Sequence, residues 1–524
     1  MSILAPIYDH DSARIAVRAG DTEIDYARLT ADIDALARHL REQGLEPGAR
    51  IALVSRNFAN PTYGDWLMQL AAIRAGLVHS TDRAPMGEAV DGEVGPLRAI
   101  VSASDTEVKD VAVDIQSIRI DFADGKPLAD VLSPKSATKL AEADAAKGGR
   151  LLATSGTTGK PKLVHWSAEV LAARIAQVGE GGFVNADTVL LPELGFPTTA
   201  GYRYPLATWI AGGTVLLSQV GSAERDGEAA RAGCNCVIAS PYRLGALLRA
   251  VEGEWPERDA RTVHLFGGAV PQRLRTAIGE RVAATAITHY GSTEAGSVAH
   301  GNLAQLAGAG AVGKPAGDVE VRIVRQGGVE QPAGTAGLIE IRSKAMVAGY
   351  VGQIESPAFK DGWFRPGDIG VLGEDGTLVV SGRTADTLNV GGAKLAPAPI
   401  ERRLARMKAI RDVALTTLPD RTGMERLVVA VATGAKVPRK QLAQRIKQVG
   451  QIGMPFALVP VGRIPRNQAG KIDRKRLRAA LARGLSKNGQ GKAVNATAKP
   501  GVQGNAASGK AGSGKAAKQG ADNG

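Results

Sequence analysis

Cysteine is almost absent from this sequence, which contains two among 524 residues. The two, Cys234 and Cys236, are separated by one residue, a spacing that suits neither a disulfide framework nor a paired zinc knuckle. This excludes the small disulfide-stapled secreted domains and indicates that both thiols are packing residues. A reducing compartment fits this composition, and the sequence predicts a cytoplasmic protein.

Long hydrophobic runs are also missing. The chain begins MSILAPIYDHD, without the basic start and sustained apolar stretch of a secretory signal peptide. The most apolar region, residues 204–220, is interrupted by Pro205, Gly212 and Gly213 and is too short to span a bilayer comfortably. We predict no transmembrane segment.

Aromatic residues are scarce at 4%, and none occurs in the last part of the chain, residues 486–524. This tail consists mainly of Gly, Ala, Asn, Gln and Lys, and it holds part of the net charge of +13. Because such a composition cannot repay the entropy of ordering, we predict a disordered tail. Nucleic-acid binding is disfavoured, since the tail has no aromatic side chain to stack on bases. It is either a solvated appendage or a weak tether to an anionic surface.

The rest of the chain is long enough for several domains and alternates helical with strand patterns. Residues 26–45 have apolar residues at helical spacing, with Gly44 as a stop, and residues 63–77 are predicted as another helix that ends at Gly76. Residues 50–57 form a buried-strand pattern between them. This rhythm predicts parallel sheets covered by helices. After about residue 315 short β-rich segments follow, with a hairpin turn signal, EDGT, at residues 374–377.

The predicted fold class is therefore α/β. We expect a large N-terminal domain, residues 1–383, of α/β layers plus a β-rich subdomain. A small mobile α/β C-terminal domain should span residues 384–485, with helix and strand patterns from residue 399 onward. The tail, residues 486–524, completes the chain.

The stretch TSGTTGKPK, residues 154–162, follows a short apolar strand pattern and concentrates hydroxyls, glycines and lysines. Glycines let backbone N–H groups approach an anion, hydroxyls add donors and lysines neutralise charge, so this is a candidate phosphate loop. It is not a Walker A sequence, because too few residues separate Gly156 from Gly159. Taken alone, such a stretch is more often a plain turn.

Polar residues in four further stretches are candidates for a nucleotide site. Glu294, in HYGSTEAG, follows an apolar strand pattern, and its carboxylate suits Mg²⁺, which prefers oxygen ligands. Asp368 follows a glycine in RPGDIG, where a carboxylate can bind both hydroxyls of a ribose. Arg383 precedes a Gly391-Gly392 pair, and Lys471 follows a glycine near the end of the ordered chain. Each also has an ordinary interpretation, as a helix cap, a turn residue, a surface pair or a solvated lysine.

In this order and at these distances, the motifs resemble those of the acyl-adenylate-forming (ANL) superfamily. Its members include acyl-CoA synthetases, luciferases and the adenylation domains of peptide synthetases. The resemblance extends from about residue 22 to residue 480 through IDYARL, the candidate phosphate loop, FGGAVP, HYGSTE, GDIG, GRTAD and AGKIDR. It implies an AMP-forming acid–thiol ligase with ATP, Mg²⁺ and CoA as cofactor and cosubstrates.

The resemblance also implies roles for single residues. The phosphates of ATP would be wrapped by Thr154, Ser155, Gly156, Thr157, Thr158, Gly159 and Lys162. Thr158 and Glu294 would hold Mg²⁺ and take part in catalysis. The adenine would lie against Gly267, Gly268 and Ala269 and under Tyr290, within a nucleotide-binding segment that also holds His289, Gly291, Ser292 and Thr293. Asp368 would bind the ribose hydroxyls, and Arg383 would support ribose and phosphate.

Two chemical steps follow from the resemblance. In the first, Lys471 would bridge the α-phosphate and the substrate carboxylate, because repulsion between two anions is the main barrier. In the second, the C-terminal domain would rotate about a hinge near Thr384 and Ala385. The loop of Val390, Gly391 and Gly392 would then face the thiol, its glycines leaving room for a pantetheine arm.

The acid pocket implied by the resemblance comprises residues 194–205, 239–247 and 267–269. These are mixed aromatic, small and hydroxyl residues without a carboxylate for an amino acid's ammonium, so the sequence favours a fatty or aryl acid. Three functions remain open. They are an acyl-CoA ligase, an acyl-AMP ligase that loads an acyl carrier protein, and a non-catalytic scaffold whose lysine-bearing tail is the working part.

Overall fold

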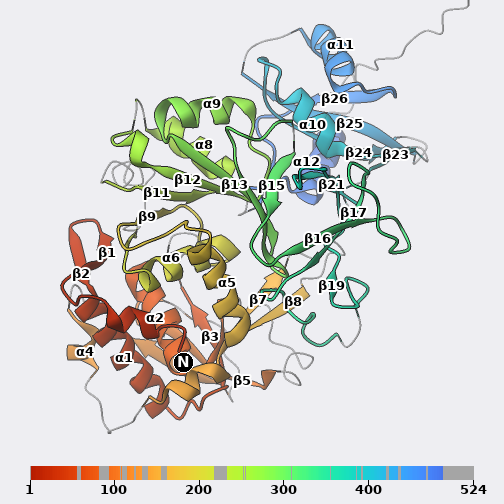
Figure 1. The fold of residues 1–524 in the computed structure, drawn as a ribbon. Coiled ribbons are helices and arrows are strands. Elements are labelled where there is room, and N and C mark those ends of the chain that lie inside the picture. The colour runs from red at the N-terminus through yellow and green to blue at the C-terminus, as the bar shows by residue number, and fades with distance from the viewer. Residues whose placement is uncertain are drawn as a thin grey trace, which may run out of the picture.

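The structure is a computed structural model, and it shows an α/β architecture (Figure 1). The residues that it describes are 2–55, 61–81, 94–106, 108, 115–122, 126–132, 140–154, 162–217, 233–251, 253, 255–308, 310–353, 356–384, 386, 388–390, 393–420, 424–434, 438–467 and 470–487. Within these ranges no helix combines the length and the apolar character needed to cross a membrane.

One sheet of the large part has six strands in the order β6-β5-β3-β4-β7-β8. All neighbours are parallel except β7 and β8. The strands are β3 (Arg50–Val54), β4 (Val78–Ser80), β5 (Leu97–Ala103), β6 (Gln116–Ile120), β7 (Gly149–Thr154) and β8 (Lys162–Ser167). Every residue of β3 is buried, as expected for a strand inside a parallel sheet.

The helix α2 (Tyr63–Arg74) packs on this sheet, and α1 (Tyr26–Glu42) packs against α2 and against α4 (Leu128–Val131). The chain turns into α1 at Asp25, whose side chain accepts from the backbone of Arg28, and into α2 at Thr62, which forms a capping box with Asp65. The predicted helix–strand–helix order of this region is confirmed.

A second sheet has 15 strands and runs through the middle of the large part (Figure 1). Its parallel section follows the order β13-β12-β11-β9-β10-β1. This section and its edge strand comprise β1 (Ile15–Ala19), β2 (Thr22–Asp25), β9 (Val189–Pro192), β10 (Thr214–Leu216), β11 (Cys236–Ala239), β12 (Thr262–Phe266) and β13 (Thr285–Ser292). The helices α5 (Ala168–Glu180), α6 (Thr199–Ile210), α8 (Pro241–Ala250) and α9 (Gln272–Arg281) connect or cover it. The predicted parallel sheets with helices are confirmed.

The same sheet continues beyond β13 as an antiparallel, β-rich section. Its strands are β14 (Gly296–Asn302), β15 (Ala311–Pro315), β16 (Glu320–Val324), β17 (Gly337–Arg342), β18 (Phe359–Lys360), β19 (Trp363–Phe364), β20 (Asp368–Leu372) and β21 (Leu378–Arg383). The predicted EDGT turn joins β20 to β21, where Gly376 has a φ of 77°. Short 3-10 helices complete the large part: η1 (Ala5–Asp9), η2 (Glu142–Lys147) and η3 (Arg258–Ala260).

The C-terminal unit has its own sheet, β24-β25-β26, and a small hairpin, β22-β23. Its elements are β22 (Leu388–Val390), β23 (Ala393–Leu395), α10 (Pro397–Leu404), β24 (Ile410–Pro419), β25 (Glu425–Thr433), α11 (Arg439–Gly450), β26 (Phe456–Pro460) and α12 (Arg474–Lys487). One apolar core lies between the sheet and α10 and α11, and a second lies between the sheet and α12. A small α/β unit was predicted here, and it is present.

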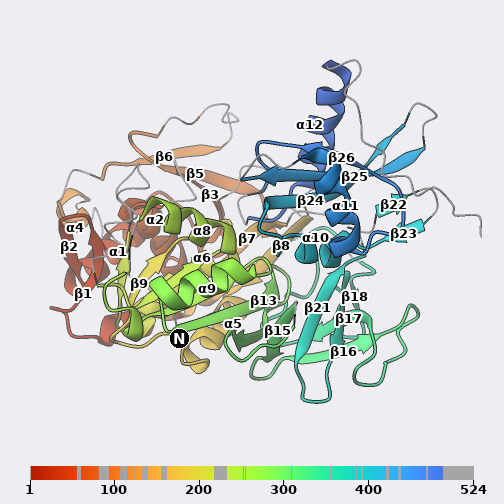
Figure 2. The same cartoon turned by 90° about the horizontal axis from the view of Figure 1, so that it is seen from above.

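The C-terminal unit, drawn in blue, lies at one side of the large part, with α10 next to β21 (Figure 2). Polar contacts join the two parts: Arg402 donates to the carbonyl of Ser381 at 3.1 Å, and Arg273 donates to that of Met407 at 3.3 Å. The loop before α12 reaches the carboxyl end of β11, since a β-carbon on Gly470 would lie 3.1 Å from Ser240 Oγ.

Candidate active site

The carboxyl ends of β11, β12 and β13 lie at one edge of the large sheet, because these strands are parallel neighbours. Ligands of open α/β sheets bind at such edges. The chain leaves β12 through Gly267, which has a φ of 86°. Gly268 follows, and a β-carbon built on it would meet no atom of the described residues within 4 Å. Tyr290 is at the end of the neighbouring strand, β13. The predicted adenine-binding residues of these two segments therefore share this edge.

A carboxylate lies next to Tyr290 and is held by two donors. Tyr290 Oη donates to Asp368 Oδ2 at 2.6 Å, and Arg383 Nε donates to Asp368 Oδ1 at 2.6 Å. Asp368 begins β20 and Arg383 ends β21, and the two are direct partners in the strand pairing. Burial and then the charge of Asp368 raise the pKa of Tyr290 well above its usual value. The phenol therefore stays a neutral donor, and the carboxylate keeps lone pairs for further donors such as hydroxyl groups.

The turn that carries Glu294 is held from below by Arg174 of α5. The guanidinium donates to the carbonyls of Thr293, Glu294 and Ala345 at 2.9, 2.8 and 2.8 Å. Trp166 donates to the Thr293 carbonyl at 3.1 Å, and its ring lies 4.2 Å from the guanidinium carbon. Arg174 is completely buried. Its hydrogen bonds thus hold the backbone of Thr293 and Glu294 in place.

The Glu294 side chain accepts from Tyr350 Oη at 3.1 Å. Lys162 Nζ in turn lies 4.4 Å from the centre of the Tyr350 ring. Lys162 and Thr154 are partners across β7 and β8 and are the two ends of the predicted phosphate loop. The Lys162 end of that loop is therefore connected to the Glu294 carboxylate through Tyr350, whereas Ser155, Gly156, Thr157, Thr158 and Gly159 lie outside the described residues.

A divalent metal at this place would depend on few protein ligands. Among the residues that the structure describes, no group of three or more His, Cys, Asp or Glu side chains converges to hold a metal ion. Glu294 offers a carboxylate that Tyr350 connects to Lys162, at one end of the loop. That donor set fits Mg²⁺, which is usually bound by one or two carboxylates together with phosphate oxygens and waters.

Lys471, from the C-terminal unit, lies within the electrostatic reach of this cluster. Burial lowers the pKa of its ammonium and Arg383 lowers it further, while the carboxylates of Asp368, Glu294 and Asp386 act in the opposite direction. The residue is nevertheless exposed to solvent. Protein groups therefore act on the ammonium, which is still open to an incoming molecule.

Three predicted nucleotide-binding residues, His289, Gly291 and Ser292, have structural surroundings of their own. His289 is buried: its Nε2 is 3.0 Å from His264 Nδ1, and its ring stacks on Phe266 with centroids 4.4 Å apart. Burial lowers the pKa of both imidazoles, that of His264 to about 3, so both are neutral near pH 7. A β-carbon on Gly291 would lie 2.2 Å from the carbonyl oxygen of Gly296, so only glycine fits there. Ser292 Oγ accepts from the backbone of Ala295 at 3.0 Å and closes the turn.

Sequence reasoning missed Arg174, Trp166 and Tyr350. For Arg174 a signal was present, because this arginine shares the helical face of Leu171, Ile175 and Val178, all of them buried. A charged residue on an apolar helix face needs partners in the interior. For Tyr350, whose contact with Glu294 spans 56 residues of sequence, the sequence holds no comparable signal. Of the predicted thiol-loop and hinge residues, Gly391, Gly392 and Ala385 lie outside the described part of the chain.

Comparison with known protein families gives a match to the AMP-binding enzyme family over residues 8–351, more than half of the chain. Among curated relatives, a sulfoacetate–CoA ligase of Cupriavidus necator is 29% identical over 62% of this chain and 66% of that protein. A salicylyl-CoA synthase / salicylate adenylyltransferase of a Streptomyces species is 27% identical over 88% and 90%. The medium/long-chain-fatty-acid–[acyl-carrier-protein] ligase FadD10 of Mycobacterium tuberculosis is 26% identical over 88% and 91%.

Solved structures share the architecture. The ATP-bound MatB of Rhodopseudomonas palustris superposes with a TM-score of 0.76 at 23% identity, over 91% of this chain and 98% of that one. The o-succinylbenzoate CoA synthetase of Bacillus subtilis, in complex with its acyl-adenylate intermediate, gives 0.74 at 22% identity over 91% and 97%. At these identities the likeness establishes the fold alone.

Proposed function

This chain belongs to the AMP-binding enzyme family, and on that premise we propose that it joins a carboxylic acid to a thiol in two steps. In the first, an oxygen of the acid attacks the α-phosphorus of ATP, the bond to the leaving pyrophosphate breaks, and an acyl-adenylate forms. In the second, the thiol of CoA loses its proton to solvent, the sulfur attacks the acyl carbon, and AMP leaves.

The observation that carries the proposal is that Lys471 lies within electrostatic range of Asp368, Arg383 and Glu294, on a turn whose Gly470 closely approaches Ser240 of the large part. The lysine comes from a different structural unit, far along the chain, and protein groups act on its ammonium, which is still accessible. An ammonium in such surroundings interacts more strongly with phosphate and carboxylate than one in bulk water. We assign it to the α-phosphate and the attacking carboxylate, where it offsets the repulsion between the two anions.

For the nucleotide, we assign the ribose hydroxyls to Asp368, whose carboxylate is already oriented by Tyr290 and Arg383. The adenine is assigned to the edge formed by Gly267, Gly268, Ala269 and Tyr290, and the phosphates to the loop of residues 154–162. Glu294 and Thr158 would hold Mg²⁺, which neutralises developing charge on the phosphates. The loop's closeness to Glu294 through Tyr350 and Lys162 supports this arrangement.

An apolar acid, fatty or aryl, is the proposed substrate class. The predicted pocket segments include Phe196, Tyr202 and Tyr204, whose side chains are fully buried. The one carboxylate adjoining the first segment, Glu193, is paired with Arg243 at 2.6 Å. A paired carboxylate is a poor receptor for an amino acid's ammonium. The relatives named for salicylate and for fatty acids both fit this class.

The identity of the thiol separates two versions of the proposal. CoA is favoured because two of the three relatives described above are named for it. A carrier-protein phosphopantetheine is the alternative, because the third is named as a carrier-protein ligase and matches this chain over a similar share of its length.

The decisive experiment is a panel of acids screened for pyrophosphate release from ATP. Each acid is tested alone, with CoA, and with a phosphopantetheinylated carrier protein, and products are identified by mass. We expect release with apolar acids and thioester formation with CoA. Thioester on the carrier alone would select the alternative, and no release with any acid would favour a non-catalytic scaffold.

A further inference from the structure

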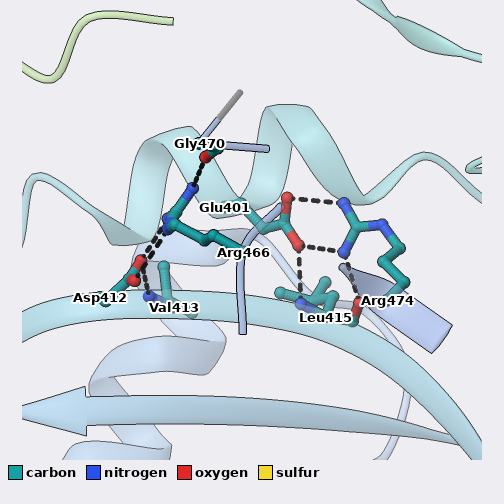
Figure 3. Close-up of polar contacts among 7 residues, drawn as sticks. All are labelled: Glu401, Asp412, Val413, Leu415, Arg466, Gly470 and Arg474. Atoms are coloured by element: carbon teal, nitrogen blue, oxygen red, sulfur yellow. Dashed lines mark hydrogen bonds and ion pairs between the residues drawn. The ribbon is translucent and has the colours of Figure 1, made fainter. Parts of the chain in front are cut away.

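Arg466 connects the sheet of the C-terminal unit to the residue that precedes Lys471. Its Nη2 donates to Asp412 Oδ1 at 2.7 Å, and its Nη1 donates to the carbonyl oxygen of Gly470 at 2.8 Å. Figure 3 shows the guanidinium between these two acceptors. Asp412 is itself held in β24, because the backbone N–H of Val413 donates to its Oδ1 at 2.9 Å.

The segment that carries Lys471 closes on itself. The backbone of Lys471 donates to Asn467 Oδ1 and the backbone of Asn467 donates to the Lys471 carbonyl, both at 2.9 Å. Arg466 also pairs with Ile472 in an antiparallel bridge. These bonds define the turn. Ile472, after Lys471, packs against the apolar core that holds Ala414 and Leu418 of β24, and Arg466 joins the other side of the turn to β24 through Asp412. Arg466 therefore fixes Gly470, the residue before Lys471, relative to the sheet of the unit.

The same turn touches the large part of the protein. A β-carbon on Gly470 would lie 2.9 Å from Tyr242 Cβ and 3.1 Å from Ser240 Oγ, and Gly470 has a φ of 77°. The Arg466 guanidinium lies 5.9 Å from the centre of the Tyr242 ring, within the range of a cation–π contact. Ser240 and Tyr242 stand at the start of α8, at the carboxyl end of β11, where the acid is expected to bind.

We propose that Arg466 is a positioning residue for Lys471: it locks the lysine-bearing turn onto Asp412 and, through Tyr242, onto the large part while the acyl-adenylate forms. This inference rests on the role given to Lys471 in the proposed function. It predicts that Arg466 serves one half-reaction only, since the second is expected to proceed with Lys471 withdrawn.

A neighbouring arginine shows what a purely structural pair looks like. Arg474 donates to both oxygens of Glu401 at 2.7 and 2.9 Å and to the Leu415 carbonyl at 2.7 Å, tying α12 to α10 and β24 (Figure 3). None of these partners belongs to the turn of Lys471 or to the large part. Arg466 differs because both the turn and Tyr242 are within its reach.

The test measures the two half-reactions separately in Arg466→Gln, Arg466→Lys and Asp412→Asn. For Arg466→Gln we expect pyrophosphate release to slow roughly 10- to 100-fold, as for a misplaced catalytic group. The KM for ATP should stay within about twofold, since the contacts proposed for adenine, ribose and Mg²⁺ lie on the large part. The rate at which preformed acyl-adenylate is converted to thioester should also stay within about twofold. Arg466→Lys should recover part of the loss, and Asp412→Asn combined with Arg466→Gln should be no worse than the more damaging single change.

Arg478→Gln is the matched control. This variant removes an arginine of the same unit. Arg478 pairs with Glu425 and donates to Thr417 at 3.0 Å. Thr417 lies in β24, five residues after Asp412. Both half-reactions should remain at the parental rates in this variant. Equal slowing of both half-reactions in Arg466→Gln and Asp412→Asn would overturn the proposal, because it would reveal a role in folding alone.

Lys471→Ala separates this inference from the function on which it rests. If Lys471→Ala abolishes adenylate formation and Arg466→Gln leaves it at the parental rate, the positioning role is wrong and the proposed function stands. If Lys471→Ala itself leaves adenylate formation unchanged, the proposed role of the lysine fails, and the positioning role fails with it.

Discussion

Arg383 lies directly opposite Asp368 in the pairing of β21 with β20, and its Nε donates to the Asp368 carboxylate at 2.6 Å. The other carboxylate oxygen accepts from Tyr290, which belongs to the parallel section of the same sheet. The carboxylate is thus oriented from two directions before any ligand arrives. A preorganised acceptor loses little conformational entropy on binding.

Removal of this acceptor should weaken nucleotide binding. We expect Asp368→Ala to raise the Kd for ATP by about tenfold or more, because two ribose hydroxyls lose their acceptor and the Arg383 and Tyr290 donors lose their partner. Tyr290→Phe keeps the ring and should cost less. Calorimetric titration measures the effect, with Glu320→Ala, at an exposed pair with Arg342, as control. A parental Kd in Asp368→Ala would contradict the ribose assignment.

Replacement of Arg174 should affect both stability and the metal-dependent step. Lysine keeps the positive charge of Arg174, but one ammonium cannot serve three carbonyls on separate residues. We expect Arg174→Lys to lower the free energy of unfolding by about 2 kcal/mol or more, since buried carbonyls lose their donors, and to raise the Mg²⁺ concentration required for pyrophosphate release. Glu180→Gln, exposed at the end of the same helix, should change neither. An unchanged Mg²⁺ dependence would show that the hydrogen bonds from Arg174 to backbone carbonyls do not position Glu294.

The pH dependence of adenylate formation should reflect the lowered pKa of Lys471. Burial disfavours its charged form, whereas the proposed role needs the ammonium. An ordinary lysine has a pKa of about 10.4. In the free enzyme, kcat/KM for pyrophosphate release should therefore begin to fall, as the pH rises, below that value. In Lys471→Arg this alkaline limb should disappear at whatever activity is left. Persistence of the limb would assign it to another group.

Acid should destabilise the fold through buried histidines. Burial lowers the pKa of His79 and of His264 to about 3, whereas an unfolded histidine has a pKa of about 6.5. At pH 7 both histidines are largely neutral in the folded and in the unfolded chain, so protonation takes little from the free energy of unfolding at that pH. Below about pH 6.5 the unfolded chain binds protons that the folded chain does not, and stability falls by up to about 1.4 kcal/mol per pH unit and histidine until about pH 3.

Denaturant titrations at pH 7, 6 and 5 measure this loss. His264→Gln removes one titrating group, so its stability should decline less steeply with falling pH than that of the parent chain. Equal slopes in the two proteins would show that His264 does not contribute.

Local sequence patterns were sufficient for much of the fold. The apolar spacing of α1 and the uniform burial of β3 are local properties, and the EDGT turn needs only its own four residues. The motif residues Asp368, Glu294 and Lys471 were named from the sequence because the family resemblance covers them, and the structure brings them near one another. The predicted roles of these residues remain predictions.

The supporting contacts could not be foreseen, because they join distant segments. Arg174 reaches carbonyls 119 to 171 residues away, and no periodicity specifies a partner at such a separation. Tyr350 and Glu294 meet only because β13, β14 and the segment after β17 pack together. His289 was assigned to the nucleotide by its neighbours in sequence, whereas its ring packs with His264 and Phe266; alternation along a strand sends adjacent side chains to opposite faces.

The three-stranded sheet of the C-terminal unit has an apolar core on each face, and every residue of both cores belongs to that unit. Among the described residues, the contacts that join the unit to the large part are of another kind: single hydrogen bonds from Arg402 and Arg273, the close approach of Gly470 to Ser240 and Tyr242, and the Arg466 guanidinium near the Tyr242 ring. A rigid movement of the unit would therefore exchange surface contacts and leave both of its cores intact. The unit is thus a rigid body attached through a weak interface, and Arg466 lies at that interface.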